Sequence, residues 1–256
     1  MRVLRFIRAL FALRKKRTWG PFVEAYEKTR FDHAFSVSWS QGGEDLALVS
    51  LLSSRPPGRY VDVGAHHPSR FSTTRLLYQQ GWSGINIEAN PDLLRKFDLE
   101  RPRDTNLNFA VGTQDNYLFQ IFSEPAISTY VDDWVEKFLS EGAVPIKEVK
   151  VQGIALRKIF DDFFFGAGPD LLCIDAEGSD YEVLMSLDLP SLSTERKPKV
   201  VLLETSPPVS TSLQLKQVHH LLEHGYEAFL VLPMATVLVL RSELISPDAV
   251  TVHNQE

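Results

Sequence analysis

Acidic and glycine residues that follow two β-rich runs are the first residues of this sequence that could do chemistry. Asp62 and Gly64 lie in the stretch Tyr60–Pro68, which reads YVDVGAHHP, and Glu88 closes the next β-rich run. Open α/β sheets bind ligands at the carboxyl ends of their strands, where an acid roughly 20 residues after the first turn accepts hydrogen bonds from ribose hydroxyls. The turn after Gly64 lacks the further glycines that let a main chain approach a pyrophosphate. The pattern therefore predicts a nucleoside ligand rather than a dinucleotide.

A second group of acids follows the apolar run Leu171–Ile174. Asp175 and Glu177 are separated by one alanine, so strand alternation directs both carboxylates to the same side. Acids near a buried strand end have raised pKa values, which suits a general base. The alternative is that one of the two carboxylates caps the following helix.

Two adjacent histidines, His66 and His67, are further candidates for the base. In an extended chain neighbouring side chains point to opposite sides, so we expect one of the two in the pocket, with His67 preferred. The other would pack against the protein or face solvent.

β-rich runs and helical stretches alternate from residue 59 onward, which predicts a parallel, doubly wound α/β sheet. Several runs are continuously apolar, as is typical of strands covered on both faces. The last two are separated by four residues, so we expect an antiparallel hairpin at one edge of the sheet. The predicted strands are Arg59–Val63, Gly84–Glu88, Leu107–Val111, Leu171–Asp175, Val200–Glu204, Ala228–Leu232 and Val237–Arg241.

Helix boundaries and one irregular region complete the expected layout. Asn90, followed by proline, is a predicted N-cap for a helix over Leu93–Leu99. Ser179 and Glu182 fit a capping box. Residues 113–168 interrupt the alternation, and we interpret them as an insertion that shapes a pocket, with an expanded crossover as the alternative. Its expected elements are strands at Tyr117–Phe122 and Glu148–Gln152 and a helix at Val131–Leu139.

Composition and charge exclude several classes of protein. The hydrophobic share of 44% and the charged share of 23% are ordinary for a globular chain. The single cysteine, Cys173, excludes a disulfide framework and a thiolate zinc site. No apolar run approaches the roughly 20 residues that span a bilayer. The formal net charge is −6 although residues 1–17 are basic, so the remainder is acidic and nucleic-acid binding is not expected.

The basic N-terminal segment leaves several interpretations open. On a helical wheel, residues 2–17 divide into an apolar half and a basic half, a pattern that Arg14 and Arg17 break, and such a helix could contact an anionic membrane peripherally. Docking on the protein's own surface or on a partner, and an organellar presequence, are the alternatives. Arginines interrupt any apolar core of a secretory signal. We therefore expect a cytoplasmic location, with membrane association as a variant of it.

Five segments in order carry a family resemblance: SQGGED at Ser40–Asp45, YVDVGAHHP at Tyr60–Pro68, GWSGINIEAN at Gly81–Asn90, RPRDTNLNFAVG at Arg101–Gly112 and IDAEGSDYEVL at Ile174–Leu184. Over residues 36–242 the chain resembles the FkbM family of S-adenosylmethionine (SAM)-dependent methyltransferases. The resemblance implies a Rossmann-like methyltransferase fold with a doubly wound, mostly parallel seven-stranded sheet and an antiparallel C-terminal hairpin. The implied division is a basic helix and linker at 1–35, a methyltransferase domain at 36–245 with the insertion at 113–168, and a tail at 246–256.

The resemblance also implies which residues hold the cofactor. Asp62, Gly64 and Ala65 would line the methionine half of SAM, Glu88 would hold the ribose with Ala89 and Asn90 beside it, and Ala110 and Val111 would lie near adenine. Gln41, Glu44 and Asp45 match the family and predict a lid over cofactor or substrate, although helix capping would explain one of the acids. Ser128, Thr129 and Tyr130 are expected to contact substrate or to form a turn. Thr73, Ala89 and Ala176 depart from the residues common in the family, and none of them removes a charged group.

The function implied is transfer of a methyl group from SAM to a hydroxyl of a saccharide, glycolipid or related natural product. Because an alcohol is a poor nucleophile until its proton is withdrawn, the candidate bases are Asp175, Glu177, His66 and His67. A metal-assisted small-molecule O-methyltransferase, in which acids including Glu204 would hold Mg²⁺, is a competing interpretation. Acidic strand ends are common to this fold, so the metal is not favoured. A non-catalytic SAM-fold binding module also fits the pattern, whereas the missing glycine turn disfavours a nucleotide-sugar enzyme such as an epimerase.

Overall fold

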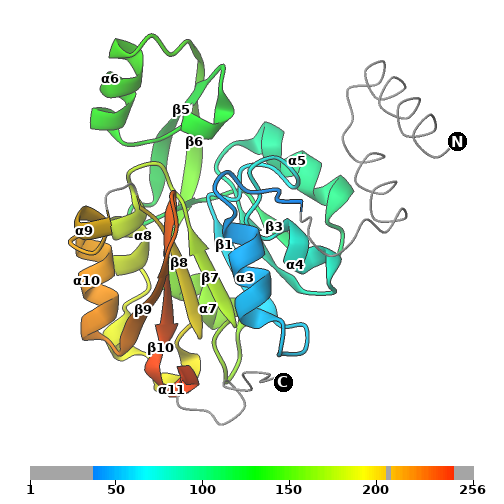
Figure 1. Cartoon of the computed structure of the whole chain (residues 1–256). Coiled ribbons are helices and arrows are strands. Elements are labelled where there is room, and N and C mark those ends of the chain that lie inside the picture. The colour runs from blue at the N-terminus through cyan, green and yellow to red at the C-terminus, as the bar shows by residue number, and fades with distance from the viewer. Residues whose placement is uncertain (1–36, 206–208, 245–256) are drawn as a thin grey trace, which may run out of the picture. The chain divides into compact units, whose positions relative to one another are not determined.

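Seven strands form the main sheet in the computed structural model, which describes residues 37–205 and 209–244 (Figure 1). The predicted basic helix, with its membrane contact at residues 2–17, and the predicted tail at 246–256 lie outside the described residues. In chain order the strands are β1 (Arg59–Val63), β2 (Ser83–Ile87), β3 (Thr105–Leu107), β7 (Leu171–Ile174), β8 (Val200–Glu204), β9 (Tyr226–Val231) and β10 (Ala235–Leu240).

The strand order is β3-β2-β1-β7-β8-β10-β9, and the first five strands run parallel. β10 is antiparallel to both β8 and β9, so the C-terminal pair forms the predicted hairpin at one edge. The order reverses between β1 and β7, which is the switch point where ligands bind in such sheets. The fold prediction of a doubly wound, mostly parallel seven-stranded sheet is confirmed.

Helices cover both faces of the sheet (Figure 1). They include α3 (Glu44–Leu52), α4 (Arg75–Gln79), α5 (Pro91–Glu100), α7 (Leu156–Phe163), α8 (Asp180–Met185) and α10 (Lys216–Glu223). Side chains of α7, α8 and α10 pack on one face with Val61 and Val63, and those of α3 and α4 pack on the other with Tyr60. Because side chains alternate along a strand, Asp62 falls on the same face as Tyr60. Shorter helices are α9 (Val209–Ser212) and α11 (Arg241–Leu244).

The third predicted strand, Leu107–Val111, is wrong as one element. β3 ends at Leu107, and β4 (Ala110–Val111) pairs with β6 (Pro145–Ile154) in a different sheet. The side-chain amide of Asn108 donates to the carbonyl oxygens of Glu88 and Ala89 at 2.8 and 2.9 Å. The side chain of Asn108 thus makes the hydrogen bonds to the end of β2 that a continued β3 would make with its main chain. The main chain therefore turns at Asn108.

Helix caps were predicted with mixed success. Asn90 is the N-cap of α5, and its side chain accepts the N–H of Asp92 at 3.0 Å, as expected. The capping box at α8 is wrong. Ser179 donates to the carbonyl of Ala176, and Glu182 accepts the Tyr117 hydroxyl at 2.7 Å. The local pattern predicted that the Glu182 carboxylate would bond within the cap of its own helix. It bonds instead to Tyr117, which is far away in the sequence.

The segment between β4 and α7 folds as a small sheet and a helix. β5 (Asn116–Phe122) pairs antiparallel with β6, and α6 (Asp132–Ser140) connects them, so the two extra strands and the helix predicted there are confirmed. Figure 1 shows this group in green, beyond the carboxyl ends of the parallel strands. Its interior contains Tyr117, Phe119 and Val151. The domain boundaries stay predictions. Within the described part of the chain, no helix is long and apolar enough to cross a membrane.

Candidate active site

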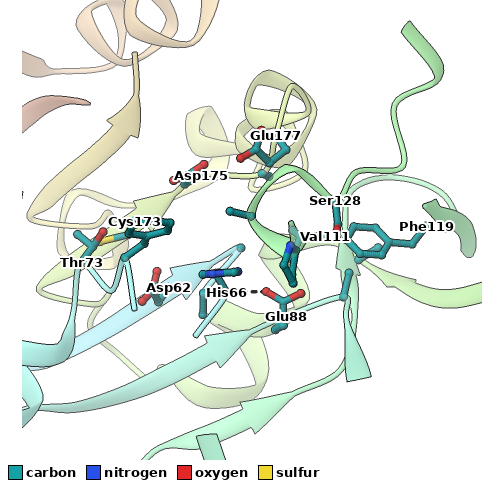
Figure 2. Close-up of a pocket in the computed structure, with 18 of the residues that line it drawn as sticks. Asp62, His66, Thr73, Glu88, Val111, Phe119, Ser128, Cys173, Asp175 and Glu177 are labelled. Carbon is teal, nitrogen blue, oxygen red and sulfur yellow. Dashed lines mark hydrogen bonds between the residues drawn. The ribbon is translucent and has the colours of Figure 1, made fainter. Parts of the chain in front are cut away.

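A pocket lies at the carboxyl ends of β1, β2 and β7, where the strand order reverses, and holds about 890 Å³ of space including its open mouth (Figure 2). Seven of the eight residues predicted to hold the cofactor line it: Asp62, Gly64, Ala65, Glu88, Ala89, Ala110 and Val111. Five residues predicted for catalysis, substrate or lid also line it: Gln41, His66, Ser128, Asp175 and Glu177. The topology therefore brings these residues together from distant parts of the sequence.

Gly64 ends β1 in the left-handed region, with φ of 74°. A Cβ atom there would collide with the carbonyl oxygen of Asp175. The N–H of Gly64 donates to the carbonyl of Ile87 at 3.0 Å. Glycine is thus required where three strand ends meet.

Glu88 is a buried carboxylate that lines the pocket apart from Asp175 and Glu177 (Figure 2). One oxygen accepts the N–H of His66 at 2.8 Å, and the other accepts the N–H of Asn90 at 2.7 Å. Burial raises the pKa of Glu88 to about 7, against the effect of these two backbone donors. Each carboxylate oxygen can accept a second hydrogen bond. The side chain is therefore fixed by the main chain and still able to bind a ligand.

Asp62 is the second buried acid on this side of the pocket. Its Oδ2 accepts the hydroxyl of Thr74 at 2.7 Å. Burial raises the pKa of Asp62 to about 6, while Thr74 and the guanidinium of Arg101 lower it.

The opposite end of the pocket is acidic. Figure 2 shows the carboxyl groups of Asp175 and Glu177 near one another, away from Glu88. The side chain of Asp175 is exposed to the open pocket. Loss of bulk water among the surrounding protein groups, then repulsion from Glu204 and Glu177, raises the pKa of Asp175 well above its usual value. Burial and the carboxylates of Glu204 and Asp180 raise the pKa of Glu177 to about 8. Burial, then the charge of Asp180, raises the pKa of Glu204, at the end of β8, to about 7, while Asp175 lowers it.

Neither Asp175 nor Glu177 caps the following helix, so that alternative is wrong. Oδ1 of Asp180 instead accepts the N–H of Ala176 at 3.0 Å. Glu177 has φ of 46°, and the glycine after it packs against Trp134 of α6. Because Asp180 and the contact with Trp134 fix the turn, the carboxylates of Asp175 and Glu177 are free of capping bonds and line the pocket.

The preference for His67 over His66 is wrong. His66 lines the pocket, with φ of 53°. The ring of His67 lies outside the lining, where its Nδ1 accepts the N–H groups of Ser69 and Arg70, each at 3.1 Å. Burial, together with the charge of Arg70, lowers the pKa of His66 to about 4, so its ring is neutral at pH 7.

Four other predicted site residues lie outside the lining and act on the backbone. Asn90 caps α5, and Thr129 donates its hydroxyl to the carbonyl of Glu177 at 2.9 Å and accepts the N–H of Val131. Asp45 accepts the N–H of Trp39 at 2.6 Å, and Glu44 accepts that of Gly42 at 2.9 Å. Their predicted roles beside cofactor or substrate stay predictions, and Glu44 and Asp45 order the turn that carries Gln41.

Tyr130, which was predicted to contact substrate or form a turn, lines the pocket, and so do three aromatic residues that sequence reasoning missed: Phe71, Phe109 and Phe119. Phe119 belongs to a strand with an apolar alternation, which was a usable signal. Phe71 has φ of 58°, which no local pattern indicates. Thr73, one of the departures from the family pattern, also lines the pocket. Among the residues that the structure describes, no group of three or more histidine, cysteine or acidic side chains could hold a metal ion.

The chain matches one family model and is similar to solved structures of methyltransferases. The family model described as Methyltransferase FkbM domain matches residues 62–228. Among solved structures, the chain is similar to a TehB-like SAM-dependent methyltransferase from Corynebacterium glutamicum, with 10% identity, a TM-score of 0.38 and coverage of 87% of this chain and 96% of that one. It is also similar to the C-terminal domain of precorrin-6Y C5,15-methyltransferase from Rhodobacter capsulatus, with 14% identity, a TM-score of 0.39 and coverage of 82% and 92%. No curated protein matches the chain.

Proposed function

Because the chain belongs to the FkbM family of SAM-dependent methyltransferases, we propose that it transfers the methyl group of SAM to a hydroxyl of a saccharide, glycolipid or related natural product. The observation that carries the proposal is one pocket with a fixed buried carboxylate, Glu88, at one end and a carboxyl group of raised pKa, Asp175, at the other.

The cofactor half of the pocket fits a nucleoside with a charged methionine tail. The two oxygens of Glu88 are positioned to accept hydrogen bonds from the two ribose hydroxyls, since each has one acceptor site left. Phe109, Ala110 and Val111 provide an apolar wall for adenine. Asp62 supplies negative charge for the ammonium group of the methionine tail. When bound, SAM supplies a methyl group on a sulfonium whose positive charge is lost on transfer.

Asp175 is the proposed general base. It stands beside Gly64, and therefore beside the methionine half of the cofactor, where the acceptor oxygen must lie. A base whose pKa is near the working pH contributes on the order of 10²–10⁴-fold in rate. Holding the acceptor oxygen in line with the methyl group contributes up to roughly 7–11 kcal/mol. Glu177 raises the pKa of Asp175 by repulsion and is the second candidate for the proton acceptor.

Lining residues that the cofactor proposal leaves unassigned support a hydroxylated ring as the substrate. Phe71, Phe119 and Tyr130 offer apolar surface, while Gln41 and Ser128 offer hydrogen-bonding groups. Ligand pockets combine these in just this way, with apolar walls that bury the ligand and a few polar groups that orient it. A saccharide presents both apolar ring faces and hydroxyls.

Two measurements test the proposal. Titration calorimetry with SAM should give saturable heat, and the absence of heat at millimolar SAM would overturn SAM binding. Incubation with saccharide and glycolipid acceptors and SAM labelled in its methyl group should place the label on oxygen, as read by mass spectrometry of the product. Label found on nitrogen or carbon would contradict O-methylation.

A further inference from the structure

A fully buried arginine lies behind the cofactor end of the pocket. Arg101, at the C-terminal end of α5, has 0% exposure and is surrounded by acceptors on the loop between β1 and α4. Its guanidinium donates to the carbonyl of Pro68 at 2.8 Å, to the hydroxyl of Ser72 at 2.5 Å and to the hydroxyl of Thr74 at 2.7 Å. A buried cation with this many partners fixes the whole loop.

Thr74 connects this arginine to the pocket. Its hydroxyl oxygen accepts from Nη1 of Arg101 and its single proton goes to Oδ2 of Asp62, each at 2.7 Å. Arginine has no acceptor, so the threonine proton cannot turn back toward it. The direction of the second hydrogen bond is therefore set by the first, and Asp62 receives a donor that holds one of its oxygens in place.

Asp104 anchors the other side of the arginine. Its carboxylate is 3.9 Å from Nη1 of Arg101 and accepts the hydroxyl of Tyr60 at 2.5 Å and the N–H of Gly84 at 2.8 Å. Both members of this ion pair have fully buried side chains. The charge of Arg101 is thus compensated within the core, and the arrangement ties β1 and β2 to the loop that carries Thr74.

We propose that Thr74 and Arg101 are positioning residues that hold the carboxylate of Asp62 ready for the ammonium group of bound SAM. This inference rests on the proposed function, because it needs Asp62 to contact the cofactor. It assigns a role to two buried residues that do not themselves touch the ligand.

The electrostatic surroundings of Asp62 decide the direction of the expected effect. Charged and titratable groups around it are Arg101 and Asp104 from the α5–β3 segment, Glu88 from the end of β2, Tyr60 from β1, and Cys173 and Asp175 from β7 and its end. Of these, Arg101 favours the charged form of Asp62 and the acids oppose it. The Thr74 hydroxyl donates to the charged form and therefore lowers the pKa of Asp62. Removal of the hydroxyl should raise that pKa, so that SAM binding is lost at a higher pH.

The test uses the full chain and measures the dissociation constant of SAM by calorimetry between pH 5.5 and 8.5. Thr74→Val keeps the shape of the side chain and removes the hydroxyl. We expect the pH at which affinity is half lost to rise by about one unit, and the dissociation constant near pH 6 to rise about fivefold. Thr74→Ser restores a hydroxyl and should bring both values back to within about twofold of the unmutated protein.

Thr236→Val is the matched control. Thr236 is a fully buried threonine whose hydroxyl bonds to that of Thr205 at 2.9 Å, and neither residue lines the pocket. The control loses a buried hydroxyl of the same kind and should leave the pH profile of SAM binding unchanged. If Thr74→Val does not fold, Thr74→Ala removes the same hydroxyl with less bulk, and a carbon-13 NMR titration of the Asp62 carboxyl in the unmutated and Thr74→Ser proteins reports its pKa directly.

The possible outcomes distinguish failure of the proposed function from failure of the positioning role of Thr74 and Arg101. An unmutated protein that binds no SAM overturns the proposed function and this inference together. An unmutated protein that binds SAM, with Thr74→Val showing the same pH midpoint or Thr74→Ser failing to restore it, overturns the inference alone.

Discussion

The main chain at Gly64 passes directly against that of Asp175, so closely that a Cβ atom on Gly64 would collide with the Asp175 carbonyl oxygen. Two strand ends from distant parts of the chain therefore meet without a side chain between them. One end carries the turn proposed to hold the methionine half of SAM, and the other carries the proposed base. The distance between the proposed cofactor turn and the proposed base is thus set by a main-chain contact.

Gly64→Ala should destabilise the protein by about 2–5 kcal/mol, because it adds a backbone collision to the cost of a left-handed conformation. The measurement is the free energy of unfolding in denaturant. Gly166→Ala is the control, since Gly166 has φ of 83° and open space around its Cβ position. It should cost about 1 kcal/mol, the strain alone. Equal effects of the two substitutions would contradict the close approach.

Glu88→Gln should weaken SAM binding more than tenfold while the protein stays folded. The amide keeps the size of the side chain, but one of its ends is a donor that would face a backbone N–H, of His66 or of Asn90. Calorimetry gives the affinity, and circular dichroism checks the fold. An unchanged dissociation constant would remove Glu88 from the ribose site.

Asp175→Asn should lower kcat by about 10²–10⁴-fold with little change in the affinity for SAM. The melting temperature should stay the same or rise, because the substitution removes one of several carboxylates that repel one another. Glu177→Gln is the comparison and should lower kcat less. If Asp175→Asn turns over normally, or if Glu177→Gln shows the larger loss, Asp175 is not the base.

The ligand-free protein should become more stable as the pH falls from 8.5 to 6.5. Raised pKa values of Glu177, about 8, and Glu88, about 7, mean that the folded state takes up protons in this range, whereas the unfolded state, with ordinary carboxyl pKa values, does not. Half-buried His66, whose pKa is lowered to about 4, opposes the trend only as the pH approaches and falls below its unfolded value of about 6.5. The melting temperature should rise by at least about 3 °C, and a fall over this interval would contradict the raised pKa values of Glu177 and Glu88.

Local patterns predicted much of the fold. The apolar runs of β1, β2, β7 and β8 and the cap at Asn90 depend on residues close together in sequence, and each is confirmed. The sequence-based predictions were wrong where a residue far away in the sequence determines the local structure. Asn108 breaks a strand by bonding to the end of β2, and Glu182 leaves a capping box for the hydroxyl of Tyr117.

Within the pocket, the strand ends could be predicted and the loops could not. The parallel topology alone brings Asp62, Glu88 and Asp175 to one edge. The choice between His66 and His67 depends on a positive φ at His66, which breaks the alternation that an extended chain would have. Phe71 reaches the pocket by a similar conformation, so no periodicity in the sequence could reveal it.

A crystal structure of the protein with S-adenosylhomocysteine would show whether Glu88 holds the ribose of the cofactor. We expect both ribose hydroxyls within about 3 Å of the two carboxylate oxygens of Glu88, with the ligand's sulfur between Gly64 and Asp175. A ribose bound away from Glu88, or a pocket left empty at saturating ligand, would contradict this arrangement.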